Sequence, residues 1–300
     1  MTMIDFHKPE IIDKEWVKKR LSSRDDLTCE YSFSNIFSYT AKMKLEIADV
    51  DGFLVTRCFT DGTIGYCYPV GDGDIRAAIE KIIEDIKTQD VPCYLFGLGS
   101  NEAKELKHLF GDTFDIKFDR DGSDYIYKSE DLINLSGKKY QPKRNHISFF
   151  KKNYNWSYES MTRYNVEECY NMNVEWLQTS GSMYSEDLEK ELRIIRRVFE
   201  NFDELGCKGA VLRVDGKVIA FALGAQIRSD TFCVHFEKAF SYLRGAYPMI
   251  NQQFVENELS EYKYIDREDD LGLENLRKAK LSYYPEFLPE KYEAWCINAY

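Results

Sequence analysis

The stretch "KGAVLRVDGKVIAFALGAQI", residues 208–227, consists of two extended apolar runs that meet at an Asp-Gly pair. An Asp-Gly pair between two such runs is a strong signal for a β-hairpin closed by a two-residue turn. The stretch "LEIADVDGFLVTRCF", residues 45–59, has the same form, and its "VDGF" corresponds to the later "VDGK". The two hairpins predict two sheets of similar design, one in each half of the chain.

Other elements surround each hairpin in a similar order. The first half contains, in sequence, predicted helices 8–23 and 31–42, hairpin 45–59, strand 62–70, helix 72–87, strand 91–98, helix 101–110 and strand 114–119. The second half contains strand 156–163, helices 166–178 and 185–205, hairpin 208–227, strand 231–240, helix 247–260, strand 262–268, a helix within 269–287 and strand 291–300. Helix 72–87 is the clearest of these, because an Asp cap precedes isoleucines at helical spacing.

The shared order indicates an internal duplication. We therefore predict a mixed α/β protein with largely antiparallel sheets and flanking helices, divided into domains at residues 1–135 and 136–300. The joint falls in the basic stretch "LSGKKYQPKRNHISFFKK", residues 135–152. The first domain lacks a cluster of basic and hydroxyl-bearing side chains like that of the second. We interpret the first domain as degenerate and place the active site in the second.

Composition limits the possible function classes. The formal net charge is −11, whereas proteins that coat duplex nucleic acid are usually basic, so duplex DNA is not an expected partner. No apolar run is long enough to form a transmembrane helix, and the first residues lack the apolar core of a signal peptide. We expect a cytoplasmic protein, with peripheral membrane contact left open. The eight cysteines form no CxxC pair, which predicts free thiols and no metal site.

The order of elements resembles the GNAT (acyl-CoA N-acyltransferase-like) fold, here in two tandem copies. Three phrases resemble the DUF2156 family: "YQPKRNHISFFKKNY" from residue 140, "HFEKAF…RGAYPMINQQF" from residue 235 and "REDDLGLENLRKAKLSYYPEFLPEKY" from residue 267. That family is similar to the C-terminal catalytic domain of phosphatidylglycerol lysyltransferase and, more distantly, to the Fem-type aminoacyl ligases. The resemblance implies acyl transfer, with aminoacyl-tRNA or acyl-CoA as co-substrate and no tightly bound cofactor.

The basic stretch at the joint is one candidate binding element. It contains several lysines and arginines, among them Lys143 and Arg144, with no acidic residue between them. One interpretation is a platform for phosphates, such as those of a tRNA acceptor end. The other is a solvated helix that pairs with acidic neighbours.

A second candidate is the segment "RGAYP" at 244–248. In the GNAT fold, the loop between the fourth strand and the third helix supplies backbone N–H groups to a pyrophosphate, because the first amides of a helix are unpaired. The candidate donor-binding residues are therefore Arg244, Gly245, Ala246 and Tyr247. The fold's usual Q/R-x-x-G-x-G/A signature is incomplete here, which argues against acetyl-CoA and leaves room for an aminoacyl ester. An ordinary strand-to-helix turn is the alternative.

Strand 231–240 offers a candidate base. Side chains alternate along a strand, so His235 and Glu237 share one face. Acyl transfer to an amine requires a base that takes the ammonium proton and a group that stabilises the oxyanion. We assign Glu237 as the base and His235 as a candidate binding residue, with a structural role as the alternative for the histidine.

The stretch "DDLGLENLRKAKLSYYPEF", residues 269–287, combines acids, bases and two tyrosines. On a helical wheel Lys280 points toward the apolar side, where it needs a carboxylate partner or an anionic ligand. Asp270 is a candidate partner and is also assigned a catalytic role. The predicted binding residues of this region are Glu268, Arg277, Lys278 and Lys280. Alternatively, these charges only complement the helix dipole.

Many GNAT enzymes carry, on the corresponding helix, a tyrosine that donates a proton to the leaving group. By this resemblance Tyr283 is assigned as a catalytic residue. We expect an acyltransferase that moves an aminoacyl group from aminoacyl-tRNA to an amine or hydroxyl group of a small molecule or peptide. The alternatives are an acyl-CoA-dependent N-acetyltransferase and a non-catalytic module that binds a nucleotide-like anionic ligand.

Overall fold

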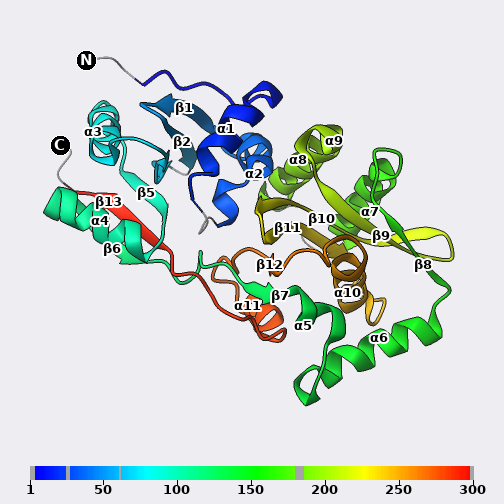
Figure 1. Cartoon of the computed structure of the whole chain (residues 1–300). Coiled ribbons are helices and arrows are strands. Elements are labelled where there is room, and N and C mark those ends of the chain that lie inside the picture. Colours follow the sequence, from blue (N-terminus) through cyan, green and yellow to red (C-terminus); the bar gives the residue numbers. More distant parts are fainter. Residues whose placement is uncertain (1–3, 25–27, 61, 180–185, 298–300) are drawn as a thin grey trace. The chain divides into compact units, whose positions relative to one another are not determined.

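A computed structural model describes residues 4–24, 28–60, 62–179 and 186–297 (Figure 1). The described residues form two compact units. The first unit comprises the chain up to Asp124, the loop Asp269–Leu273 and the segment from Leu288 onward. The second unit comprises Tyr125–Glu268 and Glu274–Phe287.

The first unit contains one mixed sheet. Its strands are β1 (Glu46–Val50), β2 (Phe53–Thr60), β3 (Thr63–Cys67), β4 (Val70–Gly71), β5 (Cys93–Leu98), β6 (Phe114–Phe118) and β13 (Tyr292–Cys296). They lie in the order β1-β2-β3-β5-β13-β6, with β4 also paired to β2. All pairs are antiparallel except β3 with β5. The helices are α1 (Lys14–Leu21), α2 (Phe33–Ser38), α3 (Ile75–Ile86) and α4 (Ser100–Phe110).

The second unit contains a second, mostly antiparallel sheet. Its strands, in spatial order, are β7 (Ile126–Lys128), β12 (Tyr264–Asp266), β11 (Thr231–Ala239), β10 (Lys217–Arg228), β9 (Lys208–Val214) and β8 (Trp156–Ser160). The helices are α5 (Ser129–Asn134), α6 (Gln141–Asn153), α7 (Val166–Thr179), α8 (Glu186–Glu200), α9 (Phe202–Leu205), α10 (Ala246–Glu258) and α11 (Glu274–Leu281). Helix α10 contacts α5, α6 and strands β9 to β11, so it lies at the centre of this unit.

Both predicted hairpins are confirmed. The turn residues Asp51 and Gly52 have φ of 51° and 93°, and Asp215 and Gly216 have φ of 50° and 80°. Two consecutive residues with positive φ define the type I′ turn, whose twist matches that of the flanking strands. The repeated Asp-Gly pair therefore sets the register of β1 with β2 and of β9 with β10.

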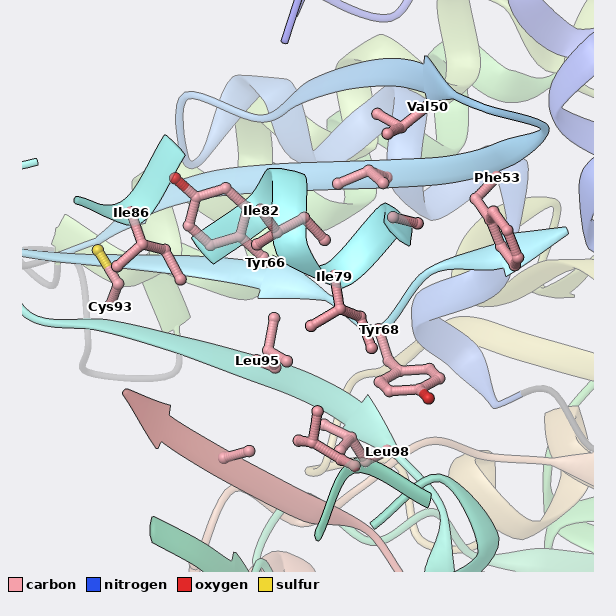
Figure 2. Packing of buried hydrophobic residues seen from close by; sticks show 14 of the residues in the cluster. Val50, Phe53, Tyr66, Tyr68, Ile79, Ile82, Ile86, Cys93, Leu95 and Leu98 are labelled. Carbon is pink, nitrogen blue, oxygen red and sulfur yellow. The ribbon is translucent and has the colours of Figure 1, made fainter. Parts of the chain in front are cut away.

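Helix α3 provides much of the apolar core of the first unit. Its cap is the predicted one, because the carboxylate of Asp74 accepts a hydrogen bond from the amide of Ala77 at 3.2 Å. The isoleucines of its inner face, Ile79 and Ile82 among them, are fully buried and point toward the sheet (Figure 2). The helical spacing of apolar residues thus gives α3 one apolar face, and this face is buried against the sheet.

The division of the chain differs from the predicted boundary at residue 135. Strand β13 pairs with β5 and β6, so the end of the chain completes the first sheet. Strand β7 pairs with β12, so residues before 135 already belong to the second unit. These pairings join strands that are far apart in sequence, and no local pattern encodes them.

Two predicted helices have different limits in the structure. The helix expected within 269–287 is limited to α11, because Leu271 and Tyr284 adopt positive φ at its two flanks. The helix expected at 185–205 divides into α8 and α9, and its first residue lies outside the described ranges. Across the described ranges, no helix combines the length and the apolar character needed to cross a bilayer.

We predict that Ile79→Ala lowers the free energy of unfolding of the first unit by about 2–5 kcal/mol, because it leaves a cavity under α3. Glu80→Ala, on the exposed side of the same helix, is the matched control and should change it by less than about 0.5 kcal/mol. Urea titration followed by circular dichroism measures both. Equal effects of the two substitutions would contradict the assigned core.

Candidate active site

A partly buried ion pair lies at the centre of the candidate site in the second unit. Glu237, near the end of β11, accepts a hydrogen bond at 3.0 Å from the guanidinium of Arg267, which follows β12. Its other carboxylate oxygen accepts one at 2.9 Å from the amide of Asn251 on α10. Both carboxylate oxygens are therefore held by the protein. These two hydrogen bonds fix the carboxylate, and the carboxylate in turn fixes the guanidinium of Arg267.

Arg267 is packed between aromatic rings. Its guanidinium carbon lies 4.8 Å from the ring centre of Tyr283 and 5.7 Å from that of Tyr127. Burial by itself would lower the pKa of Arg267, but Glu237 and the two tyrosines raise it above the ordinary value. The side chain is therefore a fixed positive charge, of the kind that stabilises a developing oxyanion.

Lys143, from α6, contributes a second nitrogen to the cluster. Its ammonium nitrogen donates to the hydroxyl of Ser282 at 2.7 Å and lies 3.9 Å from the ring centre of Tyr283. Burial lowers the pKa of Lys143 to about 8, with a further contribution from the charge of Arg267, although Glu237 opposes the shift. An amine with this pKa exchanges protons near neutral pH, as a general acid or base must.

Tyr283 joins these groups from the turn after α11. Its side chain is buried, and its backbone carbonyl accepts a hydrogen bond at 2.8 Å from the hydroxyl of Tyr140. Burial raises the pKa of Tyr283 despite the opposing charge of Arg267, so the phenol keeps its proton at neutral pH. The prediction that Tyr283 lies on a helix is wrong, because α11 ends at Leu281. Its position beside Arg267 and Lys143 is what makes it a candidate proton donor.

Lys280 is buried, as the helical wheel suggested. Its ammonium donates to the backbone carbonyls of Arg267 at 2.5 Å and of Glu268 at 3.1 Å. Through these contacts Lys280 holds the backbone of the segment that carries Arg267. Lys278, in contrast, is exposed and pairs with Glu274 one turn earlier at 2.6 Å. Arg277 is half-buried.

Glu268 and His235 form a separate buried pair. The carboxylate of Glu268 lies 2.8 Å from Nδ1 of His235 and 3.7 Å from the sulfur of Cys233. The side chain of His235 is almost completely buried, and this contact explains its place on β11. The pair ties β11 to the residue that follows Arg267.

Asp270 belongs to the first unit. Its carboxylate is fully buried, accepts a hydrogen bond from the amide of Gly272 at 2.9 Å, and lies 3.6 Å from the guanidinium of Arg120. These contacts stabilise the loop Asp269–Leu273.

The segment 244–248 forms the start of α10 but offers few amides to an anion. The amide of Ala246 donates to the carbonyl of Leu243, that of Met249 donates to the carbonyl of Gly245, and Pro248 has none. At the start of the helix this leaves the amides of Gly245 and Tyr247, for which the structure gives no backbone acceptor. The segment is thus a poor cradle for a pyrophosphate.

Structural constraints explain the composition of this segment. Gly245 has φ of 93°, and a side chain there would meet the carbonyl oxygen of His146 at 2.4 Å, so α6 requires a glycine. The guanidinium of Arg244 lies 4.5 Å from the ring centre of Phe149 on α6. Burial raises the pKa of Tyr247, so this tyrosine too is neutral.

The basic stretch has two roles in the structure. Arg144 donates to the backbone carbonyls of Leu135 and Gly137 and so closes the end of α5, which is a structural role. Lys143, the preceding residue, points into the cluster with Tyr283. One turn of helix therefore supplies both a cap and a candidate catalytic amine.

Among the described residues, two groups of side chains have the donor atoms for a metal ion, each with its atoms within 4.8 Å of one another. In Cys29, Glu30 and Asp124, the ammonium of Lys291 occupies the position of a cation, at 2.5 Å from Glu30 and 2.9 Å from Asp124. The other group is Cys233, His235 and Glu268, whose histidine and carboxylate already bind one another.

Lys143, Glu237 and Tyr283, each a candidate from the sequence, lie close together in the structure. Arg267 and Asn251 were not among the candidates. Arg267 follows a short strand, and nothing in "YIDRE" shows that the charge is directed inward. Asn251 lies within α10 and is buried. Its spacing of four residues from Tyr247 places both on one side of the helix, and this was the sequence pattern that could have identified it.

The fold places the chain in the class of tandem GNAT-like proteins. The tandem GNAT protein from the clavulanic acid biosynthesis pathway matches with a TM-score of 0.53 at 10% identity, covering 99% of each chain. L-PGS from Bacillus licheniformis matches with a TM-score of 0.63 at 15% identity, covering 95% of this chain and 92% of that one. At such identities the likeness concerns the fold alone.

The family described as "Phosphatidylglycerol lysyltransferase, C-terminal" matches residues 23–294, and the chain belongs to this family. A conserved protein of unknown function from Bacteroides thetaiotaomicron VPI-5482 is 37% identical in its crystal structure, with a TM-score of 0.92 over 98% of this chain and 100% of that one. The uncharacterized protein MYCGA3080 from Mycoplasmoides gallisepticum is 25% identical over 190 residues, 60% of this chain and 58% of that protein. The chain thus matches less than two thirds of the latter relative's length.

The pKa of Lys143 leads to a prediction about stability. The unfolded chain holds this proton up to about pH 10.5, whereas the folded protein releases it near pH 8. The unfolded state therefore binds more protons between these values, and the free energy of unfolding gains a contribution that rises with pH across this window. Lys143→Met should remove that contribution.

Urea titrations at a series of pH values measure this effect as the difference between variant and parent. Lys138→Met, at an exposed lysine nearby, is the control and should retain the parent's pH dependence. A Lys143→Met protein with the parent's pH dependence would show that Lys143 titrates normally.

Proposed function

We propose that the chain is an acyltransferase that moves an aminoacyl group from an ester donor, in the first instance aminoacyl-tRNA, to an amine or hydroxyl acceptor. The observation that carries the proposal is the cluster of Lys143, Arg267 and Tyr283 in the second unit. It combines an amine with a pKa near 8, a fixed cation and a protonated phenol. These are the groups that direct acyl transfer requires.

In this proposal the acceptor amine attacks the carbonyl carbon of the ester. The neutral form of Lys143 takes the proton that the amine loses as the new amide bond forms. Arg267 stabilises the negative charge that develops on the carbonyl oxygen. The carbon–oxygen ester bond then breaks, the phenol of Tyr283 gives its proton to the leaving ribose oxygen, and the proton held by Lys143 restores the phenol. No covalent intermediate on the protein is needed.

Glu237 has a positioning role in this scheme. It fixes the guanidinium of Arg267 and is itself fixed by Asn251, so the cation is in place before the reaction begins. Such preorganisation avoids reorientation of the dipoles during the reaction. This role replaces the proton acceptor that the sequence suggested.

Two observations favour an aminoacyl ester over acyl-CoA as donor. The first turn of α10 has few amides for a pyrophosphate. Helix α6 carries the exposed Lys151 and Lys152 in its last turn, which suits the phosphates of a tRNA acceptor end. The family is described as a phosphatidylglycerol lysyltransferase, and a lysyl group is an aminoacyl group, which supports an aminoacyl ester as the donor.

We predict that a non-hydrolysable aminoacyl-adenosine raises the melting temperature of the protein more than CoA or acetyl-CoA does, because a ligand of the native state stabilises it. Differential scanning fluorimetry at equal ligand concentrations measures the shifts. A larger shift with CoA or acetyl-CoA would contradict the aminoacyl ester and indicate a thioester donor. The absence of a shift with any of the three ligands would favour a binding module without activity.

We also predict that Lys143→Met lowers kcat of transfer from charged tRNA by about 10²-fold and abolishes the rise in rate through pH 8. Arg144→Met is the control, because that neighbour closes α5 and does not enter the cluster. The assay follows labelled aminoacyl groups from mixed charged tRNA to a panel of amines and alcohols. A Lys143→Met enzyme that keeps the parent's pH profile would remove the lysine from the chemistry.

A further inference from the structure

A cavity of about 310 Å³ lies within the first unit, apart from the residues of the proposed transfer reaction. Strand β5, strand β13 and the loop Asp269–Leu273 contribute to its lining. The volume is at the lower end of the range for small-molecule sites. The cavity therefore has room for a small organic molecule and exceeds the needs of a single metal ion.

The charge of the lining is strongly negative. Its ionisable residues are the carboxylates of Glu30, Asp119, Asp121, Asp269 and Glu293 and the amine of Lys291. The charge of Lys291 is already matched, because its ammonium contacts Glu30 at 2.5 Å and Asp124 at 2.9 Å. The lining as a whole therefore attracts cations and repels anions.

The carboxylates of the lining also affect one another. Burial raises the pKa of Glu293, and the nearby charge of Asp119 raises it further, against the lowering effects of Trp295 and Lys117. A carboxylate that is partly buried beside a like charge is stabilised when a cation enters. The raised pKa of Glu293 thus agrees with a lining that is rich in carboxylates.

Aromatic rings form another part of the lining. Tyr94, Phe96 and Tyr292 are all half-buried and line the same cavity as the carboxylates. Tyr94 is held in place by stacking on Trp295, with ring centres 4.6 Å apart. Rings attract alkyl ammonium groups through both the hydrophobic effect and the cation–π interaction, whereas hydrated metal ions gain little from them.

We propose that this cavity binds a small organic cation, with a primary ammonium group among the carboxylates and its alkyl chain against Tyr94, Phe96 and Tyr292. The inference stands on the cavity, its charge and its rings, and it does not depend on the transfer reaction. It assigns a ligand site to the first unit, which the sequence suggested was degenerate.

The test uses n-pentylamine and its neutral counterpart n-pentanol as probes of the full chain, by isothermal titration calorimetry at neutral pH. We expect saturable binding of the amine, weakened by salt, and no saturable binding of the alcohol. Equal binding of both probes, or no binding of the amine, would overturn the proposal. Calcium ion is the third probe, and a site that takes calcium but not the amine would be a metal site instead.

Two substitutions locate the site. Asp121→Asn, at an exposed residue, should weaken amine binding by about tenfold, and Phe96→Leu should weaken it by a similar factor. Glu84→Gln removes a carboxylate from the exposed side of α3 and is the matched control, expected to leave the affinity unchanged. If all three variants bind the amine like the parent, the amine binds elsewhere and the proposal fails.

Discussion

The candidate site depends on one partly buried ion pair, that of Arg267 with Glu237. A charge held largely out of water destabilises a protein when its partner is removed, so neither residue can be replaced without disturbing the other. The pair also sets the electrostatics of its neighbours, because Arg267 lowers the pKa of Lys143 and opposes the rise in that of Tyr283. Strand β11, helix α10 and the segment after β12 meet at this point.

The local parts of the fold could be predicted from the sequence. The two Asp-Gly turns and helix α3 were visible because turn residues and apolar spacing act over a few residues. The division into units was not, since β13 and β7 pair with strands far from them in sequence. The length of the helix near residue 280 was also misjudged, because Leu271 and Tyr284 adopt positive φ, which residues of their type seldom do.

The site was predictable in its residue types more than in its geometry. Glu237 on β11 followed from strand alternation, and Lys143 from an excess of positive charge in an acidic chain. Which basic residue turns inward depends on tertiary packing, and the adjacent Lys143 and Arg144 take opposite roles. The roles of Arg267 and Asn251 depend on contacts between elements distant in sequence, which no periodicity reveals.

The position of β13 has a consequence for biosynthesis. The ribosome makes most strands of the first sheet early, but it makes the strand that lies between β5 and β6 only after all segments of the second unit. Until then β5 and β6 each lack a neighbour, and an open strand edge invites pairing with other chains. The first unit therefore cannot complete its sheet before every segment of the second unit has been made, although its synthesis begins first.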